Sequence, residues 1–313
     1  MMNRPILAHG VLALTALFAA CRTIPDLGPF AETTHELAGA ISSTSNVLVA
    51  DLRRAGQGAD ADALEAALQP AVEAALAITQ YSDALANLSA AGKEGRANGE
   101  KLGGALDELA GVLAVQLPVG FGPVAGLINE WVAEVRAAAS FKLAVDAADP
   151  AIATLAPLMQ EVLAQLHDLL ENNERTLVEL ISSENQGVRI LDDVNSGKII
   201  QRHRDLTLEI TALANKAASN PLSDQEASQL LALRAELELN APQYDVAAKL
   251  VQEERRKHAT LRMAVKQASL GFGTWAKTHS ALVEAIAEER APDVRRLQQT
   301  ALEVKALIQA ARN

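Results

Sequence analysis

The sequence predicts an all-α protein, an elongated helical bundle with long coiled-coil-like helices. Composition is the first observation behind this prediction. Of the 313 residues, 49% are hydrophobic but only 3% are aromatic, and chains rich in Ala and Leu but poor in aromatic residues favour helices. The second observation is a seam of mostly apolar residues that recur in alternate steps of three and four from Tyr244 to Ile286. Such heptads are typical of long helices that pack along one face.

The first 20 residues have the composition of a signal peptide. Arg4 supplies a positive charge, residues 6–17 are mostly apolar, and two alanines precede Cys21, the only cysteine of the chain. The apolar run is too short to cross a bilayer as a helix, which takes about 20 residues. We therefore predict a signal peptide over residues 1–20, followed by an anchor and tether over residues 21–29.

The tetrad Phe-Ala-Ala-Cys at residues 18–21 resembles the lipobox of bacterial lipoproteins. The resemblance implies that Cys21 is lipidated and becomes the first residue of the mature chain. Phe18 departs from the family pattern, which favours leucine there, and Leu17 stands one position early. The alternative is a free or buried thiol behind an ordinary signal peptide.

The resemblance also suggests an address in the cell envelope. In Gram-negative members of the family, an aspartate directly after the cysteine retains the protein in the inner membrane, and this chain has Arg22 there. The resemblance therefore implies an outer-membrane lipoprotein on the periplasmic face, whose membrane contact is the lipidated Cys21. Stable anchoring takes two or more acyl chains, which lipoproteins carry. With Cys21 modified, we expect neither disulfides nor thiolate metal sites.

The mature part is acidic and is predicted to form one helical-bundle domain over residues 30–313. Removing residues 1–20 takes away one basic group, Arg4, so the formal net charge changes from −11 to −12. Such a chain lacks the basic face that nucleic acids require, and we expect no nucleic-acid partner. Turns rich in Gly and Pro separate four helices in the first half. We predict them over residues 30–54, 60–91, 100–116 and 124–147.

Residues 109–129 contain no charged side chain and read as two short apolar helices joined by a Gly/Pro turn. Each arm is too short to span a bilayer. The hairpin is therefore either buried in the bundle, docked into an apolar groove of a partner, or inserted into a membrane. An apolar hairpin among long helices is similar in architecture to the α-helical pore-forming toxins, although no motif carries that similarity. The predicted contact residues are Leu117, Val119, Phe121 and Val124.

The second half contains longer elements. Apolar periodicity begins at Pro150, which suits the first turn of a helix, and continues with interruptions to about Ala217. Ser223 and Glu226 form an S-x-x-E capping box that predicts the start of the next helix. After Pro242 the heptad seam predicts one long helix that ends at residues 291–293, and a last helix follows to the C-terminus.

Two polar residues of the seam, Glu254 and His258, lie one helical turn apart and form a candidate buried polar pair. They are either a proton-sensitive pair or half of a metal site, or they fix the alignment of the helices at some cost in stability. A di-metal bundle site needs a Glu-x-x-His pattern on each of two helices, and Glu32 with His35 forms the only such pattern in the chain. We therefore expect no metal and no cofactor.

Sequence motifs for catalysis are absent. The chain has no G-x-S-x-G, no H-E-x-x-H and no P-loop, and we expect no enzymatic activity. The sequence favours a lipid-anchored periplasmic scaffold that binds an unknown envelope protein. The alternative is a membrane-perturbing protein that uses the hairpin 109–129.

Overall fold

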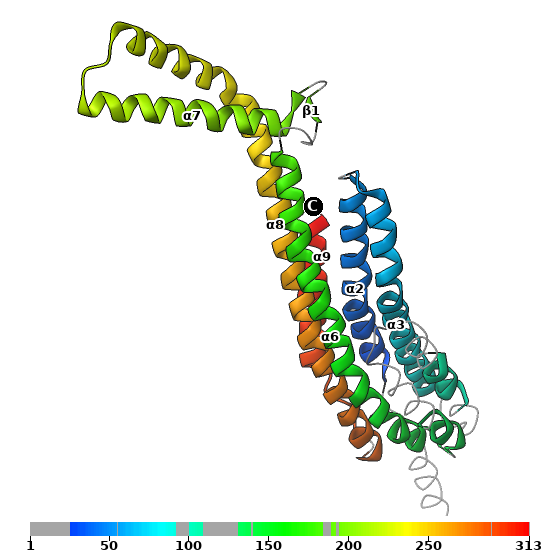
Figure 1. The fold of residues 1–313 in the computed structure, drawn as a ribbon. Coiled ribbons are helices and arrows are strands. Elements are labelled where there is room, and N and C mark those ends of the chain that lie inside the picture. Colours follow the sequence, from blue (N-terminus) through cyan, green and yellow to red (C-terminus); the bar gives the residue numbers. More distant parts are fainter. Residues whose placement is uncertain are drawn as a thin grey trace, which may run out of the picture. The chain divides into compact units, whose positions relative to one another are not determined.

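The structure is a computed structural model of the chain. It describes residues 26–54, 56–91, 100–108, 131–138, 140–183, 189–191, 194–288 and 290–312. Six helices with complete bounds account for most of these residues (Figure 1). They are α2 (Gly28–Arg54), α3 (Gly58–Ala91), α6 (Phe141–Ser182), α7 (Ser196–Ser219), α8 (Asp224–Glu288) and α9 (Arg295–Arg312). Residues 100–108 and 131–137 are also helical.

The prediction of an all-α helical bundle is confirmed. Strand structure in the described residues consists of β1 (Arg189–Leu191) and β2 (Val194–Asn195), which pair antiparallel between α6 and α7. The predicted elongated shape and coiled-coil packing stay predictions.

The chain divides into two compact units, and each takes residues from the beginning, the middle and the end of the sequence. Unit 1 comprises residues 1–39, 70–160 and 269–302, and unit 2 comprises residues 40–69, 161–268 and 303–313. Helices α2, α3, α6, α8 and α9 each contribute residues to both units. The predicted single domain over residues 30–313 stays a prediction, and the two units are described separately below.

The core of unit 1 contains most of the aromatic residues that the structure describes. Phe30 stacks on Trp275 with ring centroids 6.0 Å apart, and Phe272 meets the same indole edge-on. The Trp275 indole N–H donates to Thr34 Oγ1 at 2.9 Å. All three aromatic side chains are fully buried, so they fix the packing of α8 against α2 within this unit. Elsewhere the core is lined by small side chains, including Ala74, Ala75, Ala144 and Ala148.

Unit 2 has a core of aliphatic side chains along the predicted heptad seam of α8. Seam positions Leu261, Val265 and Ala268 are almost fully buried. Helix α6 lies beside α8 (Figure 1), where Glu174 on α6 pairs with Arg262 on α8. Other buried residues of unit 2 come from α2, α6 and α9 and include Leu48, Leu163, Leu166, Leu170 and Val304.

Unit 2 also carries a helical hairpin, which we call the arm, made of α7 and residues 224–246 of α8 (Figure 1, upper left). Its two helices run antiparallel: Arg202 pairs with Glu236 near the base and Lys216 pairs with Glu226 near the tip. At the base, His203 stacks on Tyr244 with ring centroids 3.6 Å apart. Along the arm most side chains are exposed, because two helices can bury only one seam between them.

The helices predicted over residues 30–54 and 60–91 agree closely with α2 and α3, but two other predictions were wrong: the predicted helix over residues 124–147 is interrupted at residues 138 and 140, and no helix starts at Pro150. A helix begins at Phe141 and continues through Pro150 and Pro157 to Ser182. The start is fixed by Ser140, whose hydroxyl accepts a hydrogen bond from the Leu143 N–H at 3.3 Å. Pro150 is accommodated inside the helix because the apolar residues on both sides of it are buried, and packing outweighs the lost backbone hydrogen bond.

Two further boundaries differ from the prediction. The periodic segment expected to reach Ala217 is interrupted by the β1–β2 hairpin, after which Asn195 caps α7 by accepting from the N–H groups of Gly197 and Lys198. Helix α8 begins before Pro242 and includes it. The start of α8 confirms the predicted capping box, because Ser223 Oγ accepts from the Glu226 N–H and the Glu226 carboxylate accepts from the Ser223 N–H.

Candidate functional site

The interior of unit 2 contains a cluster of charged side chains on α2 and α8. We call it the Asp51 cluster; its core members are Asp51, Glu254 and His258. Asp51 is 3% exposed, Glu254 is 9% exposed and His258 is fully buried. Charged side chains are seldom buried to this degree unless they are paired, so their partners decide what the cluster can do.

Two cations of intermediate or high exposure neutralise the carboxylates. Asp51 Oδ1 accepts from Lys257 Nζ at 2.6 Å and from Arg54 Nη2 at 3.0 Å, and Glu254 Oε1 lies 2.6 Å from Arg54 Nη2. Burial raises the pKa of Asp51, but the contact with His258, the hydrogen bond from Lys257 and the nearby positive charges outweigh it, so the pKa lies below its usual value. Asp51 is therefore an ionised carboxylate at neutral pH.

The imidazole of His258 is oriented by its own helix. Its Nδ1 lies 2.9 Å from the backbone oxygen of Glu254, and because a carbonyl oxygen only accepts, Nδ1 carries a proton and donates it. The other ring nitrogen, Nε2, lies 3.3 Å from Asp51 Oδ2 and 3.4 Å from Asn173 Nδ2. In the neutral ring, the lone pair of Nε2 therefore faces the Asp51 carboxylate.

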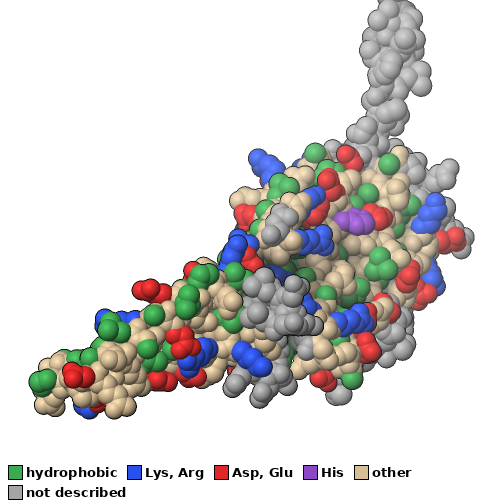
Figure 2. Space-filling view, turned by 90° about the horizontal axis from the view of Figure 1, so that it is seen from above, with side chains coloured by type: hydrophobic (Ala, Val, Ile, Leu, Met, Phe, Trp, Pro, Cys, Tyr) green, Lys and Arg blue, Asp and Glu red, His purple; other side chains and the backbone are tan. Residues whose placement is uncertain are grey.

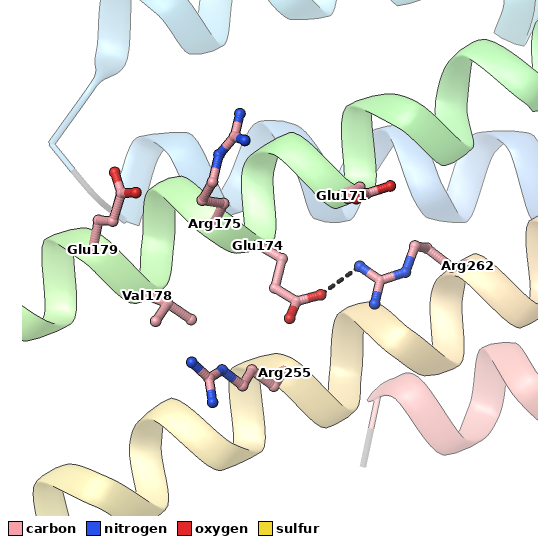
Figure 3. Close-up of a pocket in the computed structure, with 7 residues that line it drawn as sticks. All are labelled: Glu171, Glu174, Arg175, Val178, Glu179, Arg255 and Arg262. Carbon is pink, nitrogen blue, oxygen red and sulfur yellow. Dashed lines mark hydrogen bonds and ion pairs between the residues drawn. The ribbon is translucent and has the colours of Figure 1, made fainter.

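A hollow between α6 and α8 is the second candidate site of unit 2 (Figure 3). Its volume is about 600 Å³. Six charged residues and one valine line it: Glu171, Glu174, Arg175, Val178, Glu179, Arg255 and Arg262. Small-molecule sites are mostly apolar with a few polar groups, whereas here the lining is charged and Glu174 pairs with Arg262 across the two helices. The composition of this hollow gives little support for binding of an organic ligand.

Unit 1 contains a chain of hydrogen bonds that joins the half-buried Asp149 to the fully buried His279 and Tyr81. His279 Nδ1 lies 2.8 Å from Asp149 Oδ1, and its Nε2 lies 2.7 Å from the Tyr81 hydroxyl. The order of acid, imidazole and hydroxyl is the one that activates nucleophiles in hydrolases. Tyr81 is fully buried, however, and burial together with the negative charge of Asp149 raises its pKa well above 10. The hydroxyl is neither ionised nor accessible, so this chain of hydrogen bonds supports the fold.

The surface of the arm is the third candidate, because leucines on both of its helices face solvent. Leu208 on α7 is 62% exposed, and Leu231 and Leu239 on α8 are 68% and 81% exposed. In the space-filling view the arm lies at the lower left, where hydrophobic side chains are interspersed with charged ones (Figure 2). Leu231 and Leu239 are eight residues apart, a spacing that places them on one broad side of a helix.

The predicted site residues fall into two groups. Glu254 and His258 lie in the core of unit 2, one turn apart on α8. Cys21, together with Leu117, Val119, Phe121 and Val124 of the apolar hairpin, lies outside the described residues. Sequence reasoning missed Asp51, which is about 200 positions from its partners and belongs to no recognisable motif.

No protein-family model, curated protein or solved structure matches the chain. Within the part of the chain that the structure describes, every helix is too short or too polar to cross a bilayer.

Proposed function

We propose that this chain is a non-enzymatic, lipid-anchored envelope protein that acts as a periplasmic scaffold, and that its arm binds an apolar helical face of another envelope protein. The observation that carries this proposal is the set of solvent-facing leucines on the arm, Leu208, Leu231 and Leu239. Fully burying one leucine is worth roughly 1.5–3 kcal/mol. Three leucines that are 62% to 81% exposed therefore offer a partner several kcal/mol of favourable burial.

The charges of the arm favour a partner face with few charges. Residues 196–246 contain five basic and seven acidic side chains. Four of them are used in the two ion pairs that join the helices, Arg202 with Glu236 and Lys216 with Glu226. The arm thus has a net charge of −2, and apolar burial is its main means of recognition. An amphipathic helix laid along the leucines would be recognised in this way.

The anchor is supported by the resemblance of residues 18–21 to a lipobox. Replacing Cys21 with Ser should leave the helical circular dichroism unchanged and move the protein from the membrane fraction to the soluble fraction of the envelope. Full membrane association of the Cys21→Ser variant would contradict the anchor.

The proposed lack of enzymatic activity is supported by the burial of Tyr81 and His279, the hydroxyl and imidazole of the hydrogen-bond chain in unit 1. With Tyr81 and His279 fully buried, no substrate reaches the hydroxyl. In unit 2, the hollow between α6 and α8 is lined by charged residues that partly neutralise one another.

Photo-cross-linking in the intact envelope tests the arm. A photoreactive amino acid at Leu239 should give one discrete adduct with another protein, whereas the same amino acid at Leu270, which is 57% exposed in unit 1, should not. The change Leu231→Asp should reduce the Leu239 adduct at least several-fold without changing the helical content. Equal adducts at both positions, or an adduct that Leu231→Asp does not affect, would refute the assignment of the arm. An adduct with twice the mass of the chain would show that the arm binds a second copy of the chain and not another envelope protein.

A further inference from the structure

The Asp51 cluster combines three side chains that are common metal ligands. One ligand atom from each of Asp51, Glu254 and His258 lies within 4.8 Å of the other two. The i, i+4 spacing puts Glu254 and His258 on the same face of α8, and Asp51 approaches them from α2. All three residues belong to unit 2.

Each carboxylate has one oxygen in close contact with a cation and one oxygen that accepts no hydrogen bond in the described part of the chain. Among the described residues, no donor forms a hydrogen bond with Asp51 Oδ2 or Glu254 Oε2, although both atoms are buried. Asp51 Oδ2 lies 3.3 Å from His258 Nε2, and Glu254 Oε2 lies 3.9 Å from His258 Nδ1 and 3.5 Å from Lys257 Nζ. Buried polar atoms nearly always have a partner, so two such oxygens beside one imidazole point to a cation-binding site.

The imidazole has the orientation that metal ligands usually have. A metal-binding histidine almost always donates its other ring N–H to a carboxylate or a backbone carbonyl, and His258 Nδ1 donates to the Glu254 carbonyl. The distance from Nε2 to Asp51 Oδ2 also fits. Two ligand atoms each about 2.0–2.1 Å from a tetrahedral zinc ion lie about 3.3 Å apart, and the observed separation is 3.3 Å.

We propose that Asp51, Glu254 and His258 form a binding site for one divalent cation of the first transition row, for which Zn²⁺ is the probe. One imidazole and two carboxylates suit such ions, whereas Mg²⁺ and Ca²⁺ prefer oxygen ligands alone. Water would complete the coordination. This inference does not depend on the scaffold proposal, because the site lies inside unit 2 and away from the exposed leucines of the arm.

Lys257 sets the affinity of the site. Its ammonium group lies 2.6 Å from Asp51 Oδ1 and 3.5 Å from Glu254 Oε2, so its charge competes with a metal ion for the same carboxylates. The Lys257 side chain is 23% exposed, and a turn of its flexible stem towards solvent opens the route by which an ion enters. If the cluster were only a structural ion-pair network, Lys257 would stabilise it. At a metal site, the charge of Lys257 instead lowers the affinity for the ion.

Titration of the full chain with Zn²⁺, followed by isothermal calorimetry, tests the proposal. We expect one ion per chain, and we expect Mg²⁺ and Ca²⁺ to give no comparable heat. The change His258→Gln should lower the affinity for Zn²⁺ at least tenfold. The matched control His167→Gln, at a half-exposed histidine of the same unit, should leave it unchanged.

The variant Lys257→Met separates the two explanations of the cluster. If the cluster binds metal, removal of the competing charge raises the affinity for Zn²⁺ about tenfold or more. X-ray absorption of the zinc-loaded wild-type chain, which requires no variant to fold, should show one imidazole and otherwise oxygen ligands. Absence of zinc binding by the wild-type chain, a spectrum with two or more imidazoles, or a Lys257→Met variant that binds zinc more weakly would each overturn the proposal.

Discussion

Replacing Tyr81 with Phe tests whether the buried hydrogen bonds of unit 1 stabilise the fold. The change removes one hydroxyl and leaves His279 Nε2, which now lies 2.7 Å from that hydroxyl, without a partner at a fully buried position. An unsatisfied buried group costs about 1–3 kcal/mol, and the ring itself is kept, so no cavity forms. At pH 7 we expect the variant to lose about 2 kcal/mol of unfolding free energy.

The difference in unfolding free energy between the wild-type chain and the Tyr81→Phe variant should become smaller as the pH rises above 10. Burial raises the pKa of Tyr81 well above the usual value of 10.0, so the stability that Tyr81 contributes is complete below pH 10 and is lost as the pH rises towards the folded-state pKa. At pH 11 the ionised tyrosine of the unfolded wild-type chain favours unfolding by about 1.4 kcal/mol. The Phe variant lacks this effect, so the difference should narrow from about 2 to about 0.6 kcal/mol.

Urea unfolding followed by Trp275 fluorescence measures this difference. The chain has two tryptophans, so a Trp131→Phe background leaves Trp275, which stacks on Phe30 in the same unit, as the single reporter. The control Tyr244→Phe changes the other tyrosine, in unit 2, and should leave the Trp275 transition where it is. A difference below about 0.5 kcal/mol at pH 7, or one that stays constant up to pH 11, would refute the reasoning.

Three further predictions concern other parts of the chain. A Cβ at Gly271 would overlap the fully buried Leu37 side chain. The change Gly271→Ala should therefore lower the unfolding free energy by roughly 1 kcal/mol, because overpacking outweighs the gain in helix propensity. An unchanged or raised midpoint of thermal unfolding would contradict this. Hydrogen bonds from His279 and Ser280 outweigh burial and hold the pKa of Asp149 below 3.8. The stability it contributes is present above pH 3.8 and lost as the pH falls, so Asp149→Asn should cost about 1–2 kcal/mol at pH 7 and less in acid, whereas a cost independent of pH would argue against the ion pair. If the hairpin 109–129 inserts into membranes, the chain should release dye from liposomes and Val119→Asp should abolish the release; no release by the wild-type chain would dismiss membrane perturbation.

Local signals explain which helix boundaries could be predicted. The capping box of Ser223 and Glu226 involves residues three apart, and its hydrogen bonds form as the pattern indicates. The heptad seam likewise depends on one helix, and its positions from Glu254 to Leu282 are buried. Pro150 misled the prediction because tertiary packing keeps a proline inside a helix at a cost that sequence patterns do not reveal.

The Asp51 cluster shows the limit of such reasoning for a candidate site. Glu254 and His258 could be paired from their spacing, since four residues make about one turn. Nothing in the sequence indicates that Asp51, on another helix, completes the group, because distant residues meet only through the packing of α2 on α8. The same holds for Tyr81 and His279, which are 198 positions apart.

The division of the chain into units has a consequence for the order of folding. Residues 269–302 complete unit 1 and residues 303–313 complete unit 2, so a growing chain lacks part of both units until its last helix has been made. Contacts between such distant segments form slowly, because long loops must close first. A chain that crosses a membrane unfolded, as our proposal requires, benefits from this delay, because it stays competent for export until residues 269–313 have been made. Truncation before residue 302 should then leave both units incomplete, whereas truncation within residues 303–313 should affect unit 2 alone.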